Sequence, residues 1–164
     1  MSHPRDQNTT TSFALLVTSD SRTIENDETG NLAVQLIEEA GHKVTLRGIV
    51  PNDSEKIKEW LSEAIKNDTP VIITSGGTGI GSVDKTVDTA KTLFDKEMPG
   101  FGEHFRRLSY DEVGVSGLMS RSVAGVVGKK LIFCLPGSKG AMRTALREII
   151  LPGVGHMLWE LNRR

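Results

Sequence analysis

The sequence predicts an α/β fold with a mostly parallel sheet and helices on both of its faces. Short apolar, β-branched runs alternate along the chain with longer segments whose apolar residues recur at helical spacing. Strands that alternate with helices in this way are typical of a parallel sheet covered on both sides. No linker, internal repeat or low-complexity block divides the chain, so we expect a single domain over residues 13–164. Residues 1–12 are polar, and we expect them to form a disordered tail.

The first predicted strand covers residues 13–18, because a continuous apolar run suits a strand that is buried on both faces. The apolar residues of the following helix share one face at Ala33, Leu36, Ile37 and Ala40. Gly41 is expected to end this helix, since glycine readily adopts the left-handed conformation of a helix C-terminus.

Residues 44–50 are the second predicted strand, and residues 71–74, which begin with the apolar, β-branched run Val71-Ile72-Ile73, are the third. An amphipathic helix lies between them, with an apolar face of Ile57, Trp60, Leu61, Ala64 and Ile65. A glycine-rich loop follows the third strand, and the next helix is predicted from about Thr86 to Asp95.

The second half of the chain begins with a helix whose apolar stripe suits either the core or a partner. That stripe consists of Phe101, Phe105 and Leu108. Residues 123–127 and 130–135 flank Gly128, so we expect them to pair as a hairpin.

A further helix is predicted after residue 138 and through Ile149, and Pro152 with Gly153 should break it. A short final helix then carries an apolar face of Val154, Met157, Leu158 and Leu161.

Composition and charge exclude several classes of protein. The net charge is −1 and only 5% of residues are aromatic, which argues against nucleic-acid partners. No apolar run is long enough to span a bilayer and no secretory signal is found, so we expect no membrane partner. One cysteine allows no intrachain disulfide, so we expect a cytoplasmic protein. The single cysteine, Cys134, lies in an apolar run and is expected to be a buried structural thiol.

Residues 74–86 are the most informative stretch, because four glycines lie between Gly76 and Gly81. A glycine turn between a strand and a helix N-terminus directs backbone N–H groups toward an anion. Asp84 ends the loop, and a carboxylate beside a phosphate requires a cation between them, most simply Mg²⁺. The stretch is not a P-loop, since Asp84 precedes Lys-Thr, and it is not a dinucleotide fingerprint, since Ser82 replaces the third glycine. A surface turn without a ligand remains the alternative.

Ligands of open α/β sheets bind outside the carboxyl ends of the strands, so the sequence predicts one shared pocket there. Its candidates are residues 19–22, 51–53, 75–84 and 136–139.

Several of these polar residues would also suit a purely structural role. Asp84 would cap the helix that starts near Lys85, and Ser138 would cap the helix after it. Asp53 would cap its helix, with Asn52 and Glu55 spaced as in a capping box. We expect Asp27 to be solvated in a polar loop.

Six motifs occur in order between residues 13 and 160: residues 19–22, 75–79, Asp84 with Thr86, 97–103, 118–122 and 135–138. Together they resemble the MoaB/Mog family of molybdenum-cofactor biosynthesis proteins. The resemblance implies a three-layer α/β/α sandwich that binds molybdopterin, a pterin dithiolene with a terminal phosphate. It also implies a homotrimer or homohexamer and, in the Mog-like branch, transfer of AMP from MgATP to that phosphate.

Residues 19–22 and 102–109 look like the MoaB branch of the family. Adenylylating relatives usually carry Asp after the proline of the second strand end, and Arg before the Asp of the glycine loop. This chain has Asn52 and Val83 at those positions, so Asp53 would have to substitute.

The resemblance and the strand ends together define the predicted site. Asp84 and Asp53 are the predicted catalytic residues and Mg²⁺ ligands. The predicted substrate-binding residues are Asp20, Ser21, Ser75, Gly76, Gly77, Thr78, Gly79, Ser120, Arg121, Pro136, Gly137 and Ser138. Arg121 suits a phosphate through its planar fork of donors, and a surface ion pair is its alternative role.

Three functions are compatible with these patterns. The first is an enzyme that transfers AMP from MgATP to molybdopterin. The second is a MoaB-type protein that binds molybdopterin or its precursor without turnover. The third is a flavodoxin-like binder of a nucleotide or flavin, which the small number of aromatic residues disfavours.

Overall fold

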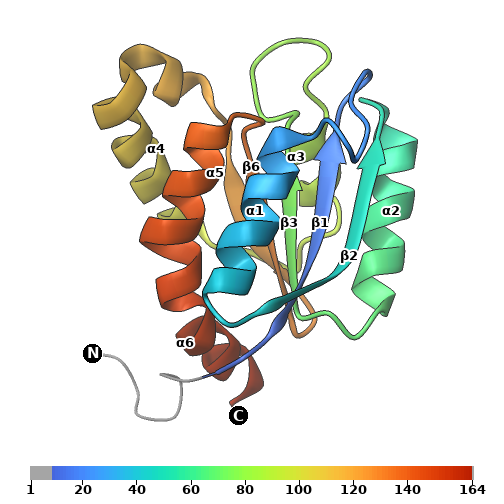
Figure 1. Ribbon diagram of the computed structural model, residues 1–164, viewed down its shortest axis with the longest axis vertical. Helices are drawn as coiled ribbons and strands as arrows, with labels where there is room; N and C mark the ends of the chain where they lie inside the picture. Colours follow the sequence, from blue (N-terminus) through green and yellow to red (C-terminus); the bar gives the residue numbers. More distant parts are fainter. Residues whose placement is uncertain (1–8, 164) are drawn as a thin grey trace.

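A computed structural model describes residues 9–163, so most of the predicted tail, residues 1–8, lies outside the described residues. Within the described part, six strands form one sheet in the order β2-β1-β3-β6-β5-β4. Figure 1 labels β2, β1, β3 and β6 of this sheet. The strands are β1 (Ser12–Thr18), β2 (Lys43–Val50), β3 (Val71–Ser75), β4 (Lys96–Glu97), β5 (Val123–Val127) and β6 (Lys130–Leu135).

Four strands, β2, β1, β3 and β6, run parallel to one another. β5 and β4 extend the sheet beyond β6, and each is antiparallel to its neighbour. This arrangement confirms the mostly parallel sheet and the hairpin around Gly128. β1 begins at Ser12, and the carbonyl of Thr11 already accepts a hydrogen bond from Lys43, so these two residues belong to the sheet rather than to a tail. β4 was not predicted, because two residues carry no periodicity.

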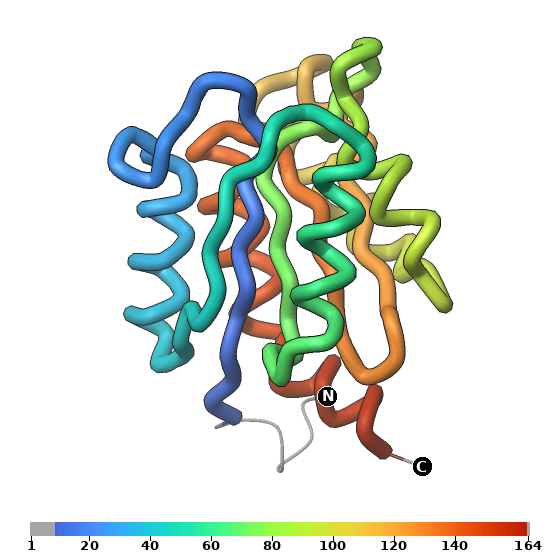
Figure 2. Tube along the Cα trace, turned by 90° about the vertical axis from the view of Figure 1, so that its right-hand side faces the viewer, coloured from blue at the N-terminus to red at the C-terminus, as the bar shows by residue number. Residues whose placement is uncertain are grey.

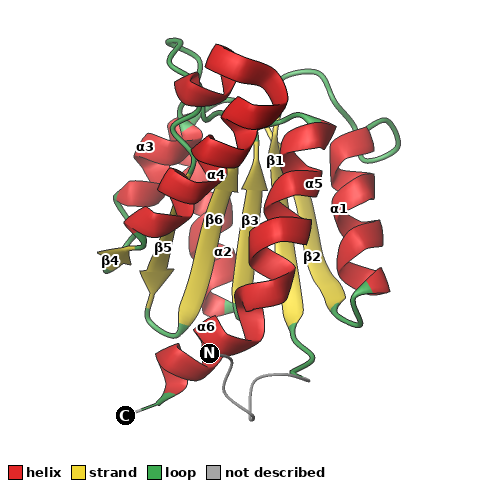
Figure 3. Ribbon diagram, turned by 90° about the vertical axis from the view of Figure 1, so that its left-hand side faces the viewer, coloured by secondary structure: helices red, strands yellow, loops and turns green. Residues whose placement is uncertain are grey.

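Two layers of helices cover the sheet, which confirms the three-layer sandwich (Figures 2 and 3). One face carries α1 (Glu28–Glu39), α4 (Pro99–Val113), α5 (Lys139–Ala145) and α6 (Leu151–Asn162), and the other carries α2 (Ser54–Lys66) and α3 (Thr86–Lys91). Phe13 and Leu15 of β1 pack under the first layer, whereas Ala14 and Leu16 pack under the second. Successive strand residues point to opposite faces, so a strand between two layers needs an unbroken apolar run.

α3 is shorter than predicted, and α4 decides between the two roles that the sequence left open for its apolar stripe. α3 ends at Lys91, because the chain turns to join the sheet edge and Asp95 donates its backbone N–H to Val126. α4 buries Phe101 and Phe105 in the core, so this apolar stripe does not face a partner. No helix within residues 9–163 has the length and apolar character that a bilayer crossing requires.

The predicted helix break at Pro152 is wrong. α5 continues through a π-helical turn (Leu146–Ile150) directly into α6, and Pro152 lies in the first turn of α6. Proline is tolerated there because the wider turn before it accommodates its ring and its missing N–H.

The chain changes direction across the sheet between β1 and β3. β1 leads through α1 to β2 on one side, and β2 leads through α2, on the opposite face, to β3 on the other side of β1. The loops after β1 and β3 therefore diverge at the carboxyl edge. Open α/β sheets bind ligands in the crevice that such a switch point leaves.

Candidate functional site

The glycine loop starts at the end of β3 in a conformation that only glycine adopts easily. Gly76 has φ of +100° and Gly77 has φ of +71°. A Cβ on Gly77 would lie 2.1 Å from Oγ1 of Thr86, and a Cβ on Gly76 would lie 2.8 Å from the carbonyl oxygen of Thr18. These glycines are therefore required for packing of the loop itself, independently of any ligand.

Buried threonines join the base of this loop to β1. Thr86 donates its backbone N–H to Gly77 over 3.2 Å, and its hydroxyl donates to Oγ1 of Thr18 over 3.2 Å. Oγ1 of Thr18 in turn donates to the carbonyl of Ser75 over 3.4 Å. The start of α3 and the ends of β1 and β3 thus form one connected unit.

Arg121 holds the far side of the glycine loop. Its Nε donates to Gly79 over 2.8 Å, one Nη donates to the carbonyl of Asp84 over 3.2 Å, and its backbone N–H donates to Thr78 over 2.7 Å. Its two Nη atoms also reach both carboxylate oxygens of Asp88, at 2.8 and 3.0 Å. Arg121 lies beside the loop as predicted, and it forms the ion pair that the structural alternative required.

The Arg121–Asp88 pair shifts the acid–base behaviour of both residues. The hydrogen bonds from Arg121 hold the pKa of Asp88 below its ordinary value of 3.8, and those to Asp88 raise the pKa of Arg121. Sequence reasoning missed Asp88, since one exposed acid near a helix start carries no distinguishing pattern.

Asp84 folds back over the glycine loop. Its Oδ2 accepts a hydrogen bond from the backbone N–H of Gly81 over 3.0 Å. α3 begins after Lys85 without a side-chain cap, so Asp84 does not take the capping role that was its structural alternative. No residue in the described part of the chain donates to Oδ1 of Asp84, which leaves one carboxylate oxygen for a ligand.

Asp53 caps α2, as the structural alternative predicted. Its Oδ1 accepts the backbone N–H of Lys56 over 3.0 Å, and the cap position belongs to Asp53 rather than to Asn52. Asn52 instead binds Asp20 twice, through its backbone N–H over 2.9 Å and through its Nδ2 over 3.1 Å. These two hydrogen bonds, assisted by the charge of Lys85, lower the pKa of Asp20.

Two further residues of the loop after β1 have structural contacts. The hydroxyl of Ser19 accepts the backbone N–H groups of Ser21 and Arg22, which turns the chain away from the sheet. The prediction that Asp27 is solvated is wrong, because Asp27 is fully buried, caps α1 and lies 3.3 Å from Arg47.

The turn after β6 lies across from the glycine loop. Ser138 caps α5 through the backbone N–H of Ala141, and the hydroxyl of Ser75 donates to the carbonyl of Pro136 over 3.5 Å. A Cβ on Gly137 would lie 3.6 Å from the Cα of Gly76, so the two turns approach without crowding. The exposed residues of this turn therefore border the same edge as the glycine loop.

Magnesium fits this edge only as an ion held partly by its substrate. Within residues 9–163, no group of three or more acidic, cysteine or histidine side chains gathers to hold a metal. Asp84 offers a carboxylate oxygen, and Asp53 uses one oxygen as a cap. Mg²⁺ commonly takes one or two carboxylates and completes its shell with phosphate oxygens and water.

Cys134 is the buried structural thiol that the sequence predicts. It is fully buried, and burial raises the pKa of its thiol to about 11. The thiol is therefore protonated near neutral pH and is no nucleophile.

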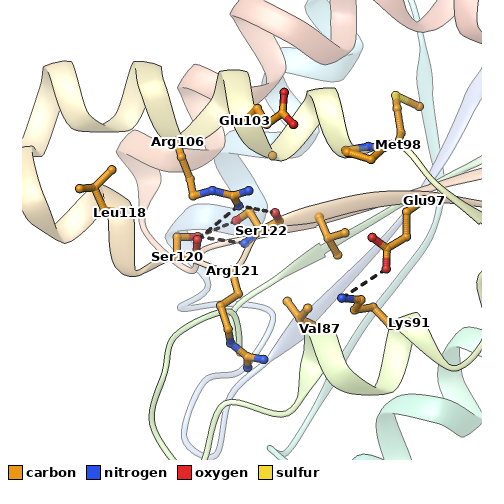
Figure 4. A pocket seen from close by; sticks show the side chains of 13 residues that line it. Val87, Lys91, Glu97, Met98, Glu103, Arg106, Leu118, Ser120, Arg121 and Ser122 are labelled. Carbon is orange, nitrogen blue, oxygen red and sulfur yellow. Dashed lines mark hydrogen bonds and ion pairs between the residues drawn. The ribbon is translucent and has the colours of Figure 1, made fainter.

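A cleft of about 430 Å³ lies on the far side of Arg121, between α3 and the start of α4 (Figure 4). It is lined by Val87, Lys91, Glu97, Met98, Pro99, Gly102, Glu103, Arg106, Leu118, Ser120, Arg121, Ser122 and Val123. The hydroxyl of Ser120 lies 3.4 Å from that of Thr78 and 2.7 Å from that of Ser122. Ser120 and Arg121 are thus shared between the glycine loop and this cleft, which sequence reasoning did not predict.

Residues 14–156 match the protein family described as "Probable molybdopterin binding domain". The chain is 45% identical over 152 residues to molybdenum cofactor biosynthesis protein B of Bacillus cereus, across 92% of this chain and 90% of that relative. The protein of the same name from Bacillus subtilis (strain 168) is 38% identical over 151 residues, across 91% of this chain and 89% of that relative.

Solved structures agree with these matches. A crystal structure of molybdenum cofactor biosynthesis protein B superposes with a TM-score of 0.91 at 44% identity, across 95% of this chain and 98% of that one. The tungsten cofactor synthesizing protein MoaB from Pyrococcus furiosus superposes with a TM-score of 0.85 at 36% identity, across 95% and 99% of the two chains. A structure of MogA superposes with a TM-score of 0.84 at 30% identity, across 92% and 99%.

Proposed function

This chain belongs to the molybdopterin-binding domain family, as a MoaB-type protein of molybdenum cofactor biosynthesis, and from that premise we propose that it adenylylates molybdopterin. The proposed reaction transfers AMP from MgATP to the terminal phosphate of molybdopterin. The observation that carries the proposal is the glycine loop at the β1–β3 switch point, which presents a carboxylate oxygen of Asp84 at its edge.

The step requires little covalent help from the protein. An oxygen of the molybdopterin phosphate bonds to the α-phosphorus of ATP, the bond from that phosphorus to the bridging oxygen breaks, and pyrophosphate leaves. Catalysis of such a transfer depends on alignment of the two anions and on neutralised charge. The backbone of residues 76–79 would hold a phosphate, and Arg121 and Thr86 keep that backbone in place.

Magnesium would neutralise the phosphates when it is bound. Asp84 is the proposed protein ligand, because one of its oxygens is fixed by Gly81 while the other has no donor within the described residues. Asp53 keeps a second carboxylate oxygen after the end of β2, although its role as a cap makes it the weaker candidate.

Binding without turnover is the second candidate, and a specific observation favours it. Asn52 stands where adenylylating relatives carry Asp, and it is engaged with Asp20 rather than available to a metal. The guanidinium of Arg121 likewise already donates hydrogen bonds to Asp88 and to the glycine loop. In this case the protein would bind molybdopterin and leave adenylylation to another enzyme.

One experiment separates the two functions. The purified protein is incubated with molybdopterin, ATP and Mg²⁺, and adenylylated molybdopterin and pyrophosphate are measured against a reaction without metal. Formation of both products in equal amounts supports the enzyme. Binding of molybdopterin without either product supports the non-catalytic role, and absence of binding contradicts both.

A further inference from the structure

The first turn of α1 is held in place by polar contacts with β2. Asp27 is fully buried, caps α1 at the backbone N–H of Gly30 over 3.0 Å, and lies 3.3 Å from Arg47 of β2. Arg47 also donates to Oδ1 of Asn31 over 2.8 Å. A Cβ on Gly30 would lie 2.0 Å from Oδ2 of Asp27, so the helix start approaches its cap as closely as glycine allows. The fold therefore fixes this turn independently of any ligand.

Thr29 in this turn reaches across to the turn after β6. It is only 3% exposed, and its hydroxyl donates to the carbonyl of Gly137, 108 residues away in the sequence, over 2.9 Å. An ion pair at the surface, between Glu28 and Lys139 at 3.2 Å, joins the same two segments. α1 and α5 lie side by side (Figure 1), so the hydroxyl of Thr29 connects the start of α1 to the turn that leads into α5.

The turn after β6 also contacts the start of the glycine loop. Gly76 donates its backbone N–H to the carbonyl of Leu135 over 2.9 Å, and the hydroxyl of Ser75 donates to Pro136 over 3.5 Å. A Cβ on Gly137 would lie 3.6 Å from the Cα of Gly76. A change in the orientation of Gly137 would therefore be felt at the edge of the proposed site.

The backbone of Gly137 depends on an outside contact for its orientation. Glycine has no Cβ, so rotation about its backbone bonds meets little steric resistance. No peptide bond in residues 9–163 is cis, and in a trans peptide the carbonyl of Gly137 and the N–H of Ser138 point in opposite directions. The hydrogen bond from Thr29 thus sets the direction of both groups. Gly137 is exposed, so without this bond its carbonyl would be free to turn toward water.

We propose that Thr29 is a positioning residue of the site, whose hydroxyl holds the Gly137–Ser138 peptide in the orientation that bound molybdopterin requires. The inference rests on the proposed function, because it takes molybdopterin as the ligand at this edge of the sheet. Thr29 is buried beneath the turn, so it acts through the turn and not by contact with the substrate.

The test compares two substitutions of Thr29. Thr29→Val keeps the shape of the side chain without its hydroxyl, and Thr29→Ser keeps the hydroxyl. Thr29→Val should bind molybdopterin at least about tenfold more weakly, because the hydrogen bond that orders the turn is lost. The NMR signal of the Ser138 amide in the ligand-free protein should move in Thr29→Val. In Thr29→Ser both the amide signal and the affinity should return toward their wild-type values.

Thr144→Val is the matched control. Thr144 is also buried, and its hydroxyl donates to Glu112, which joins α5 to α4 without involving the turn after β6. Thr144→Val should lower the midpoint of urea unfolding, as Thr29→Val does, while its affinity for molybdopterin stays at the wild-type value. An equal loss of affinity in both variants would assign the effect to general destabilisation and overturn the positioning role.

The remaining outcomes separate the two proposals. If the wild type binds molybdopterin and the folded Thr29→Val protein binds it equally, or if the Ser138 amide signal does not move, the role of Thr29 is overturned and the proposed function stands. The same conclusion follows if Thr29→Ser restores the amide signal without restoring the affinity. If the wild type binds no molybdopterin, the proposed function is overturned together with this inference. Circular dichroism of each variant shows that a loss of binding is not a loss of fold.

Discussion

Single residues of the glycine loop have two roles that substitutions can separate. Gly76 and Gly77 are constrained by the protein, since the space for a side chain is filled by Thr18 and Thr86. Asp84 is only partly constrained, because one of its oxygens is bound within the loop. Substitutions of the glycines therefore test how the loop packs, and substitutions of Asp84 test whether its carboxylate binds a metal.

Gly77→Ala should lower the free energy of unfolding by about 2 kcal/mol or more. Alanine is strained at a φ of +71°, and its Cβ would lie 2.1 Å from the Thr86 hydroxyl. Gly137→Ala is the control, because its Cβ would meet the Cα of Gly76 at an ordinary 3.6 Å. Urea denaturation of the two variants checks the difference, and equal stability would contradict the packing argument.

Asp84→Asn should leave stability within about 1 kcal/mol of the wild type, because the amide oxygen still accepts the N–H of Gly81. If the protein is the proposed enzyme, Mg²⁺-dependent turnover should fall at least about tenfold with the lost charge. Asp68→Asn, an exposed site after α2, is the matched control. Intact turnover would assign Asp84 to loop structure alone.

Asn52→Ala should raise the pKa of Asp20 toward its ordinary value of 3.8, because the side-chain hydrogen bond that helps to lower it disappears. Because the folded-state pKa of Asp20 lies below 3.8, the stability that the Asp20–Asn52 hydrogen bonds contribute is fully present above pH 3.8. That contribution is lost as the pH falls through the lowered pKa and the carboxylate becomes protonated. Titration of the Asp20 carboxyl by NMR measures both values. An unchanged pKa would show that the backbone N–H alone sets it.

Asn52→Asp places a second carboxylate against Asp20, and the two repel each other unless a cation lies between them. For the proposed enzyme we expect turnover to rise only at high Mg²⁺, while the affinity for molybdopterin changes much less. Turnover and binding are therefore measured across a Mg²⁺ series. A fast wild type that gains nothing from the change would favour Asp53 as the functional carboxylate.

At the scale of elements, the site depends on contacts between segments that are distant in the sequence. The chain after the 3₁₀ helix η1 (Gly114–Met119) returns to the glycine loop, where Arg121 binds Gly79, Asp84 and Asp88. α3 and the loop before β5 are held together by this one side chain. The loop is therefore pre-formed before any ligand binds.

Arg121→Lys should loosen the loop, because a lysine ammonium cannot reproduce the fork that reaches Asp88 and Gly79 together. We expect faster hydrogen exchange at the backbone N–H of Gly81 and weaker molybdopterin binding. Arg107→Lys, at an exposed position of α4, is the control. Unchanged exchange at Gly81 would show that Asp84 and Thr86 suffice to hold the loop.

At the scale of the whole molecule, several exposed apolar side chains lie close together in the sequence, whereas Ile24, Ile80 and Val83 are exposed elsewhere in the described chain. The clustered side chains cover the end of α4 and η1 and are Tyr110, Val113, Val115, Leu118 and Met119, which are 46–65% exposed. The buried stripe of α4 faces the core, so this second surface is the better candidate for contact with another copy.

We expect a homotrimer or a dimer of trimers, with three or six times the 17.9 kDa mass of the chain. Val115→Lys should shift the assembly toward smaller species, because a charge in an apolar contact is costly. Sedimentation at micromolar concentration measures the mass of the wild-type assembly and of the Val115→Lys variant. A wild-type monomer near 18 kDa would contradict the expectation.

The order of residues along the chain was sufficient to predict the layers and the edge at which ligands would bind. Unbroken apolar runs specify strands buried on both faces, and helical spacing specifies the helices that cover them, so local patterns were enough. The glycine loop was equally visible, because four closely spaced glycines after a buried strand are typical of an anion-binding turn. β4 was not predicted, because a strand of two residues has no detectable periodicity. The continuous helix through Pro152 was not predicted either, because it depends on a π-helical turn that has no characteristic residue spacing.

Folding in three dimensions determined which polar side chains of the site are available. Asp53 is held by the helix that it caps, Asp20 by Asn52, and Arg121 by Asp88, whereas Asp84 keeps one oxygen without a donor in the described chain. Each of these assignments depends on a partner brought close by folding, and the Arg121–Asp88 contact spans 33 residues. A hydrogen bond depends on distance and angle in space, so sequence spacing identifies the candidate groups while the fold determines which of them can bind a ligand.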